Sequence, residues 1–396
     1  ITEYVTQILT DAGFAVRHQP AHVGADGQTF SNIIAEKGSG GHSILFYGHM
    51  DTVSSAPWSS EHEALRPRRE VRDGREVLVG LGACDMKSGV AAMITALGYG
   101  IAPEGYRVKL VLGVDEEGYS MGANAIAQSS ELDDVVGIVV PEISDGRSPS
   151  HGPRTLLVGR LGRAEFEVRL RGSGGHGAHS RDTRVVNAAT EASKLVLALE
   201  SFARQHRDVL SVAERYGVRG PGEVEGSLYV SLVVAGQGTM TIPTDASVII
   251  DWTLTPGLSP TKALTLLEHF VRKQYETGVL NAPITPEPPF VVHPRLAPTP
   301  VSPGFLLSAD DPFASFVAET IRATIGLDSV DVGYSVADEN VFRRTRLDIP
   351  VVSVGPLGGN YHEAGEWVDT TSVHELEAVL RAIAKNFAEY SRRNEF

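Results

Sequence analysis

The sequence of 396 residues contains one cysteine, Cys84, which excludes an intramolecular disulfide and a cysteine-rich zinc site. It also lacks an apolar run of the roughly 18 residues that a membrane-spanning helix needs. No signal-peptide pattern follows Ile1, although we expect that some residues precede it, which leaves a removed leader open. We therefore expect a cytoplasmic protein without a membrane partner.

Basic residues are also in short supply. The chain has 35 Lys and Arg against 49 Asp and Glu, which gives a net charge of −14. Because phosphate binding requires a basic surface, this balance argues against nucleic acid as a partner and favours a small-molecule substrate. Part of the excess carboxylate would form the wall of a cation site, and the larger part would be ordinary solvated surface.

The sequence predicts an α/β sheet in its first and last parts. Four apolar runs rich in β-branched residues read as strands that are buried on both faces, as in a mostly parallel sheet covered by helices. Residues 89–98 and 312–325 read as helices, and residues 374–390 as a long final helix. The four predicted strands are residues 42–47, 108–114, 135–140 and 350–355.

The pattern changes around Arg163, where polar and apolar residues begin to alternate as in a sheet with one solvated face. Strand-like and helix-like segments follow in a β-α-β-β-α-β-like order, which predicts an inserted α+β (ferredoxin-like) module. A chain of this length exceeds what one core usually covers. We therefore expect a catalytic domain made of residues 1–162 and 300–396, interrupted by a module of residues 163–299 that a proline-rich stretch, residues 282–303, closes.

Histidine and acidic side chains follow several predicted strands. Ligands bind at the carboxyl ends of the strands of an open α/β sheet, so these side chains should converge in one crevice. Each of them alone has an ordinary structural explanation, since Asp and Glu are common in turns and at helix starts. Agreement of all of them at one sheet edge favours a metal site; they are His49, Asp51, Asp85, Asp115, Glu116, Glu117, Glu142 and His362.

Imidazole and carboxylate without thiolate suit Zn, Mn or Co rather than a structural zinc or a calcium ion. Five or six such ligands exceed what one catalytic zinc uses, so we expect two divalent ions that share a bridging carboxylate. Such a pair polarises a substrate oxygen and activates a metal-bridging water. A neighbouring carboxylate that binds no metal would then act as the base.

The ordered segments GHMDTV, GACDMKSG, DEEG and VPE, together with the late His362, resemble the M20 metallopeptidase and deacylase family over essentially the whole chain. That family includes carboxypeptidase G2-like enzymes, acetylornithine deacetylases, succinyl-diaminopimelate desuccinylases and aminoacylases. The resemblance implies that one ion is held by His49, Asp85 and Glu142, and that the other is held by Asp85, Glu117 and His362.

The resemblance also implies three catalytic roles. Glu116 would be the general base, and Asp51 would orient the ring of His49. The stretch GGHGAHS is similar to the family's lid motif, in which a histidine reaches the active site of the partner subunit and stabilises the oxyanion. His179 matches that position better than His176, so we expect at least a homodimer in which the inserted module serves as lid and dimerisation domain.

Two lid positions depart from the family's pattern. Where family members that bind a substrate carboxylate often show Asn-Val-Ile-Pro, this chain has Met240-Thr241-Ile242-Pro243. Where they show Asp-x-Arg, it has Asp251-Trp252-Thr253. The carboxylate clamp that arginine supplies is therefore absent at Thr253, unless another arginine substitutes, such as Arg181, Arg184 or Arg343. We take Met240 and Thr253 as candidate substrate contacts.

We expect a hydrolase of a C–N bond in a small N-acyl amino acid or peptide-like substrate. The alternative is an aminohydrolase that acts on an aromatic acid of the 5-nitroanthranilate type, because the thioether of Met240 would pack well on a ring. A catalytically silent metal-binding homologue ranks lower, since neither a ligand nor the base has been lost. A di-metal phosphoesterase also ranks lower, because the order of the lid and the DEEG pair argue against it.

Overall fold

The computed structural model describes residues 1–24, 27–143, 152–182, 184–236, 238, 240–295 and 302–394. The chain forms two compact units, each with its own hydrophobic core. Unit 1 comprises Ile1–Arg160, Val212–Gly222 and Phe305–Phe396, and unit 2 comprises Leu161–Ser211 and Glu223–Gly304. The short return of residues 212–222 to unit 1 was not expected, and the expected domain boundaries remain a prediction.

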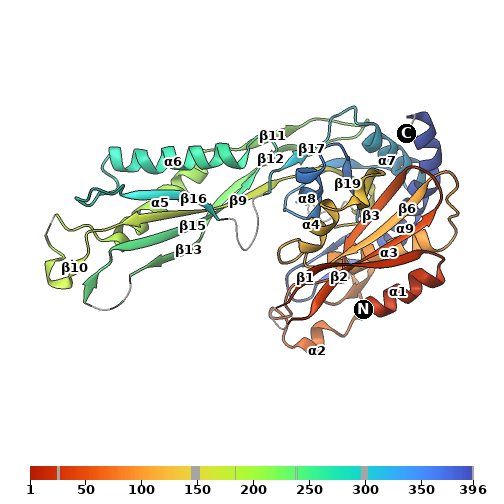
Figure 1. Cartoon of the computed structure of the whole chain (residues 1–396), viewed down its shortest axis with the longest axis horizontal. Coiled ribbons are helices and arrows are strands. Elements are labelled where there is room, and N and C mark those ends of the chain that lie inside the picture. The colour runs from red at the N-terminus through yellow and green to blue at the C-terminus, as the bar shows by residue number, and fades with distance from the viewer. Residues whose placement is uncertain are drawn as a thin grey trace. The chain divides into compact units, whose positions relative to one another are not determined.

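Unit 1 is built on a large mixed sheet (Figure 1). Its centre is parallel, because β3 pairs in parallel with β6 on one side and with β7 on the other, and β7 pairs in parallel with β19. The outer pairs β1–β2, β2–β6 and β8–β17 are antiparallel. In spatial order the strands are β1 (Ala15–Val23), β2 (Thr29–Gly38), β6 (Arg107–Gly113), β3 (Ser43–His49), β7 (Val135–Val140), β19 (Val351–Ser353), β8 (Thr155–Arg160) and β17 (Phe305–Leu306), with β18 (Ser329–Gly333) beside β8.

Helices bury the central strands of this sheet. Every residue of β3 is buried, as expected for a strand covered on both faces. Helix α3 packs against α9 and α9 against α7, whereas α4 packs against α8. The helices of unit 1 are α1 (Thr2–Asp11), α2 (Glu61–Ala64), α3 (Ser88–Gly98), α4 (Met121–Ala127), α7 (Pro312–Thr324), α8 (Asp338–Thr345) and α9 (Thr370–Arg393).

A second, smaller sheet of unit 1 supports one loop of the candidate site. Strand β21 pairs with β5, and Trp367 lies opposite Val79. The hairpin between β20 and β21 contains His362. The strands in order are β20 (Gly358–Gly359), β21 (Trp367–Asp369), β5 (Arg75–Val79) and β4 (Arg68–Arg72).

Unit 2 is an antiparallel sheet with two helices on one face. The buried positions of β9 alternate with partly exposed ones, so one face of the sheet packs on helices and the other is more open. Trp252 and Phe166 are buried in the core between this sheet and the helices. In spatial order the strands of the sheet are β13 (Ser227–Ala235), β15 (Asp245–Leu254), β9 (Gly162–Arg171) and β16 (Phe290–Arg295). The helices are α5 (Ala188–Gln205) and α6 (Pro260–Glu276). Two short strand pairs are also present, β10 (Gly175–His176) with β14 (Thr241–Ile242) and β11 (Val209–Val212) with β12 (Gly222–Glu225).

The α/β class, the parallel centre and the helix-backed second unit are confirmed. The proline-rich stretch 282–303 was wrongly taken as connection alone, because its residues 290–295 form the edge strand β16. Pro294 lies in this strand and is tolerated because an edge strand leaves one side unpaired. The first predicted strand, residues 42–47, is observed as Ser43–His49 and so extends to the candidate ligand itself. In the described part of the chain, no helix has the length and apolarity to cross a bilayer.

Candidate metal centre

Three neighbouring parallel strands deliver candidate ligands to the same edge of the large sheet. His49 is the last residue of β3 and lies opposite Gly113, the last residue of β6. Glu116 and Glu117 follow β6 in the chain, and Glu142 follows β7. The carboxyl ends of parallel neighbours lie at one edge, so these side chains meet there.

The first group of donor atoms surrounds the buried ring of His49. Its Nε2 lies 3.1 Å from Asp85 Oδ1 and 3.4 Å from Glu142 Oε2. One nitrogen and two carboxylate oxygens, all within 4.8 Å of one another, could hold a divalent ion. This is the donor set that zinc and similar metals accept.

The second group uses the other oxygen of Asp85. His362 Nε2 lies 3.3 Å from Asp85 Oδ2 and 3.0 Å from Glu117 Oε2. His362 has a φ of 62°, a left-handed conformation that is uncommon outside glycine and concentrates at functional sites. Asp85 therefore faces both groups, one carboxylate oxygen to each.

The charges in the cluster fit bound cations. Burial, and then the nearby Asp85 carboxylate, raises the pKa of Glu142 to about 7. Hydrogen bonds to Asp85 and Glu117 raise the pKa of His362 to about 10. Burial alone would raise the pKa of Asp85, but its bonds to His362 and His49 lower it below the ordinary value. Carboxylates packed this closely are stabilised by positive charge, which the two imidazoles or metal ions supply.

Asp51 lies behind His49 and links two parts of the cluster. Its Oδ1 is 3.6 Å from His49 Nδ1, and its Oδ2 accepts a hydrogen bond of 3.0 Å from the backbone N–H of Glu117. Both His49 Nδ1 and Asp51 Oδ1 are buried. A metal-bound histidine commonly turns its second nitrogen towards a carboxylate in this way.

Glu116 lies beside the cluster, with a carboxylate oxygen within 4.8 Å of donor atoms of His49 and Glu117. Burial raises the pKa of Glu116 well above its ordinary value; His49 opposes this rise, and the Asp338 carboxylate adds to it. A carboxyl group with a raised pKa is suited to accept a proton and release it near neutral pH.

Sequence reasoning missed two buried carboxylates near these groups. Asp338, the first residue of α8, accepts a hydrogen bond of 2.5 Å from Tyr47 OH. Glu366 accepts hydrogen bonds from three backbone N–H groups of the turn that carries Asp85. Asp338 was missed because the short strand β18 that precedes it was not recognised. Glu366 lies in the run HEAGE, of which only His362 was taken as functional.

The structure gives no support to a nucleophilic role for Cys84. Its side chain is buried, and burial raises the pKa of the thiol well above its ordinary value. A carbon atom added to Gly358 would lie 2.2 Å from Cys84 Sγ, so the sulfur is closely packed. Reactive cysteines have low pKa values and are accessible, and Cys84 is neither.

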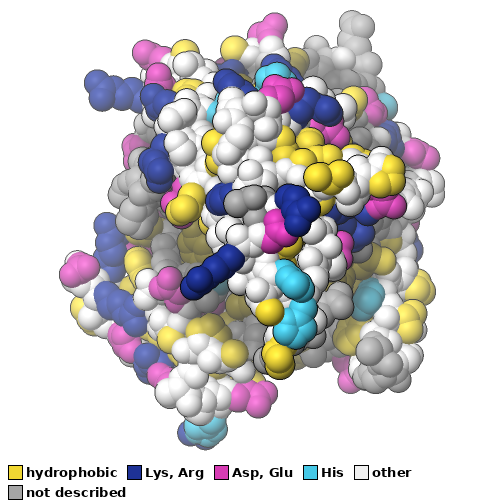
Figure 2. All heavy atoms as spheres, turned by 90° about the vertical axis from the view of Figure 1, so that its left-hand side faces the viewer, with side chains coloured by type: hydrophobic (Ala, Val, Ile, Leu, Met, Phe, Trp, Pro, Cys, Tyr) yellow, Lys and Arg dark blue, Asp and Glu magenta, His cyan; other side chains and the backbone are white. Residues whose placement is uncertain are grey.

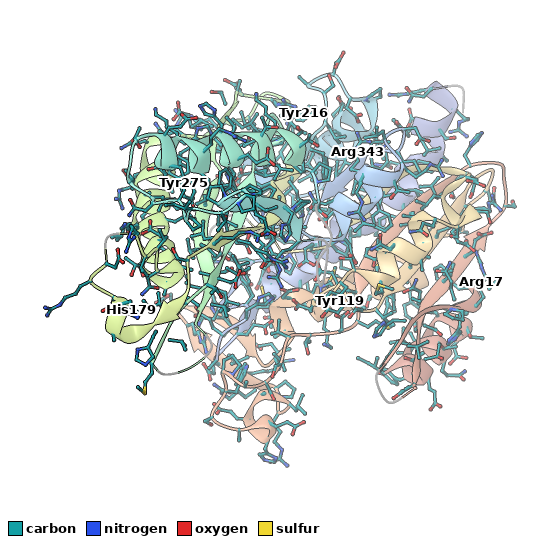
Figure 3. The ribbon with its side chains drawn as sticks, turned by 60° about the vertical axis from the view of Figure 1, so that its left-hand side comes forward. Arg17, Tyr119, His179, Tyr216, Tyr275 and Arg343 are labelled. Carbon is teal, nitrogen blue, oxygen red and sulfur yellow. The ribbon has the colours of Figure 1, made fainter. Side chains whose placement is uncertain are left out.

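The residues of the lid prediction belong to unit 2, whereas the other candidates not yet described, Asp115 and Arg343, lie in unit 1. His179 lies in a short turn, Gly177–His179, and its exposed ring is 6.4 Å from that of His176. Figure 3 shows His179 at the surface of this unit, and Figure 2 shows exposed histidine side chains gathered on one face. Met240 is 72% exposed with a φ of 64°.

Thr253 is half-buried on β15 and accepts a hydrogen bond of 3.3 Å from Ser227 Oγ. Arg163 lies opposite Thr253 on β9, but its guanidinium is paired with Asp251. Thr253 is uncharged and the guanidinium of Arg163 is engaged by Asp251, so this pair of residues offers no available positive charge to a substrate carboxylate.

Comparison with known proteins agrees with this geometry. The sequence profile described as peptidase family M20/M25/M40 matches residues 45–386. The chain is 26% identical to a succinyl-diaminopimelate desuccinylase of Phenylobacterium zucineum, over 98% of this chain and 93% of the relative.

Two solved structures share the fold. The aminopeptidase PepT of Bacillus cereus has a TM-score of 0.70 at 19% identity and covers 98% of this chain and 92% of its own. The YXEP protein of Bacillus subtilis, described as a dinuclear metal binding peptidase, has a TM-score of 0.64 at 15% identity, with the same coverage. The chain thus belongs to peptidase family M20/M25/M40 and is one of its metallo-hydrolases acting on amide bonds.

Proposed function

We propose that this enzyme uses two divalent metal ions, with zinc as the best fit and manganese or cobalt as alternatives, to hydrolyse the amide bond of a small N-acyl amino acid or peptide-like substrate. The observation that carries the proposal is the carboxylate of Asp85, whose two oxygens face His49 and His362 respectively. The name of the desuccinylase relative supports an N-acyl substrate.

The two donor groups supply the ligand assignment. His49, Asp85 and Glu142 would hold one ion, and Asp85, Glu117 and His362 would hold the other. Bound there, two such ions polarise a carbonyl oxygen and lower the pKa of a water molecule. Asp51 would orient the ring of His49, whose Nδ1 lies 3.6 Å from Oδ1, while its other oxygen accepts a hydrogen bond from the backbone N–H of Glu117.

Glu116 is the proposed general base. It takes a proton from the attacking water, whose oxygen forms a new bond to the carbonyl carbon. It then gives that proton to the leaving nitrogen as the C–N bond breaks, which releases an amine and a carboxylic acid that loses its remaining proton to solvent. Its burial and raised pKa suit a group that must hold a proton between these two steps.

Turnover of a Glu116→Gln variant tests this assignment. Because the amide cannot take the proton, the rate should fall by about 10²–10⁴-fold while both metal ions remain bound. Asp115→Asn is the matched control: Asp115 is the adjacent carboxylate and binds the backbone N–H of Tyr119, so its turnover should stay within a few-fold of wild type. Full activity of Glu116→Gln would contradict the mechanism.

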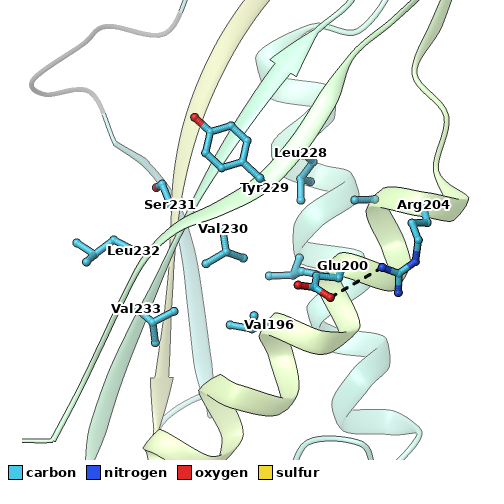
Figure 4. Close-up of a pocket in the computed structure, with 11 residues that line it drawn as sticks. Val196, Glu200, Arg204, Leu228, Tyr229, Val230, Ser231, Leu232 and Val233 are labelled. Atoms are coloured by element: carbon cyan, nitrogen blue, oxygen red, sulfur yellow. Dashed lines mark ion pairs between the residues drawn. The ribbon is translucent and has the colours of Figure 1, made fainter. Parts of the chain in front are cut away.

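The active form is proposed to be a homodimer in which His179 stabilises the oxyanion in the site of the other subunit. Unit 2 offers a surface for this contact. Strand β13 is an edge of its sheet and exposes Leu232, Val233 and Val234, and an apolar groove runs between β13 and α5 (Figure 4). A second copy whose β13 paired antiparallel to this one would satisfy the free edge and cover these side chains.

The charges on α5 also suit a second copy. Glu200 and Arg204 form an ion pair four residues apart on the helix, so an antiparallel α5 across a two-fold axis would present opposite charges. Light scattering should show a dimer for wild type and a monomer for Leu232→Lys. Val291→Lys, on the opposite edge strand β16, is the control and should stay dimeric. A monomeric wild type would refute the assembly.

Substrate selection is assigned to unit 2. Met240 and Thr253 stand where the family shows an amide and an arginine, and Arg163 is engaged by Asp251. Of the three substitutes considered, Arg184 pairs with Asp182, and Arg343 donates to the backbone carbonyls of Leu347 and Ile349. We therefore assign a substrate carboxylate to Arg181, which is exposed.

The second candidate is an aminohydrolase that removes an amino group from an aromatic acid of the 5-nitroanthranilate type, favoured by the exposed thioether of Met240. A panel of N-acyl amino acids, dipeptides and anthranilates, run on enzyme loaded separately with zinc and manganese, separates the two. Release of a carboxylic acid from the N-acyl amino acids or dipeptides supports the amide hydrolase. If the only product detected is ammonia from the anthranilates, the aminohydrolase is the function instead. The cytoplasmic location remains a prediction.

A further inference from the structure

Glu366 is a buried carboxylate to which the proposed mechanism gives no role. It is 1% exposed, and its two oxygens accept three backbone hydrogen bonds. The N–H of Gly82 donates to Oε2 at 2.8 Å, and the N–H groups of Cys84 and Asp85 donate to Oε1 at 2.7 and 2.9 Å. All three donors lie in the turn that carries the shared ligand Asp85.

This turn needs an external acceptor. Gly82 is left-handed with a φ of 74°, and Asp85 has a φ of −111° and a ψ of 101°, outside the helical range. Backbone N–H groups in such a turn are not satisfied by a regular helical ladder, and leaving them unpaired when buried costs about 1–3 kcal/mol each. The carboxylate of Glu366 meets this need for three donors at once.

The turn is also tightly packed around these bonds. A carbon atom added to Gly82 would lie 2.6 Å from the Cγ2 atom of Thr52 and 2.8 Å from Lys87 Nζ. The backbone carbonyl of Glu366 accepts a further bond of 3.0 Å from the N–H of Gly80. The path from Gly80 to Asp85 is therefore fixed at four points by one residue.

Glu366 lies four residues after His362, just before strand β21. Strand β21, into which the loop of His362 runs, pairs with β5, which leads into the turn of Asp85; the two ligand loops therefore adjoin neighbouring strands. Glu366 thus joins the loop of His362 to the turn of Asp85 through its hydrogen bonds.

We infer that Glu366 is a positioning residue that holds the Asp85 carboxylate with one oxygen towards each metal ion, and so sets the affinity for both. This inference rests on the two-ion centre proposed above. Partners that orient a metal ligand typically contribute a factor of about 10–100 in metal affinity. Since Asp85 is shared, the loss should affect both ions rather than one.

A metal titration of Glu366→Gln tests the inference without any substrate. The amide keeps the size of the side chain but turns one acceptor into a donor that opposes a backbone N–H. The metal-free protein is titrated with Zn²⁺ against a chromophoric chelator, and the absorption spectrum of the Co²⁺ form reports the ligand geometry. The matched control is Glu191→Gln, a buried carboxylate of unit 2 that accepts a bond of 2.8 Å from the N–H of Asn281.

We expect Glu366→Gln to bind both ions about 10–100-fold more weakly, with an altered Co²⁺ spectrum, whereas Glu191→Gln keeps wild-type affinity and spectrum even if its Tm falls. Unchanged metal affinity in Glu366→Gln, with only a lower Tm, would overturn the inference and show a purely structural role. If Glu366→Gln does not fold, the same titration of Glu366→Asp decides in the same way. A wild type that binds fewer than two ions would instead refute the proposed centre.

Discussion

The two units hold their candidate functional residues in different ways. In unit 1 the side chains contact one another: His49, Asp85 and Glu142 form one group, and Asp85 joins Glu117 and His362 in the next. In unit 2, His179 and Met240 are exposed. The proposed chemistry therefore rests on a preorganised cluster, whereas the proposed substrate choice rests on exposed residues that a ligand or a second copy would cover.

The units also differ in their agreement with the family's pattern. The segments that carry the proposed metal ligands resemble the family's motifs, whereas the segments of Met240 and Thr253 depart from them. On unit 2 the arginine nearest to Thr253 in register is tied to Asp251. The comparison teaches that the reaction type can be inferred from unit 1 alone, while the substrate must be sought through variants of unit 2.

The largest effect is expected from Asp85→Ala. Both groups of ligands lose their shared carboxylate, so metal content should drop for both ions, and turnover should fall by roughly 10⁴-fold or more, at least as far as for loss of the base. Metal analysis and initial rates measure this. Asp133→Ala, at an exposed carboxylate of the same unit, serves as the control. If Asp85→Ala still bound one ion at full occupancy, the two ion sites would be independent, which would contradict a shared Asp85.

The next effect concerns the exposed histidine. Loss of one oxyanion-stabilising donor should lower kcat of His179→Ala by about 10²–10³-fold with little change in KM. Because the donor is proposed to act on the other subunit, mixing His179→Ala with Glu116→Gln should restore about a quarter of wild-type activity through mixed dimers. No recovery after subunit exchange would place His179 outside the partner's site.

A smaller effect is expected for Arg181→Ala. A charged hydrogen bond is worth about 1.5–3 kcal/mol, so KM for a substrate with a free carboxylate should rise by about one to two orders of magnitude, and kcat should change little. Arg184→Ala is the matched control because Arg184 is paired with Asp182. Equal KM values for Arg181→Ala and wild type would remove the carboxylate clamp from this position.

The smallest effect concerns the stability of unit 2. Hydrogen bonds from Arg169, and then from Ser247 and His293, lower the pKa of Glu167 to about 2. A lowered pKa in the folded state means that this carboxylate stabilises unit 2 above the ordinary value of 4.5 and that the contribution is lost as the pH falls towards 2. The Tm difference between wild type and Glu167→Gln should therefore shrink from pH 6 to pH 2. A constant difference would show that the charge is irrelevant.

The sequence was informative where strand ends fix positions. His49, Glu116, Glu117 and Glu142 follow parallel strands whose apolar runs are unmistakable, so their convergence could be expected. Asp338 does not follow this rule. Strand β18 is parallel to β8, which is antiparallel to β19, so the carboxyl end of β18 lies at the other edge of the sheet; the strand is also only five residues long and contains Asp331.

Other features could not be read from local patterns. Glu366 acts through backbone bonds to a turn nearly 300 residues earlier, and no side-chain motif announces such a contact. Strand β16 was hidden by prolines, since Pro294 is compatible with a strand only when that strand lies at an edge. Oligomeric state and substrate depend on a second molecule; the motif around His179 predicts a dimer only through its resemblance to the family's lid motif.

Anomalous diffraction at the zinc edge, from crystals grown with Zn²⁺, tests the central claim most directly. The account predicts two peaks about 3.5–4 Å apart, each at about 2.0–2.2 Å from a different oxygen of Asp85, with His49 and Glu142 on one and His362 and Glu117 on the other. A single peak, or two peaks that do not share Asp85, would contradict it.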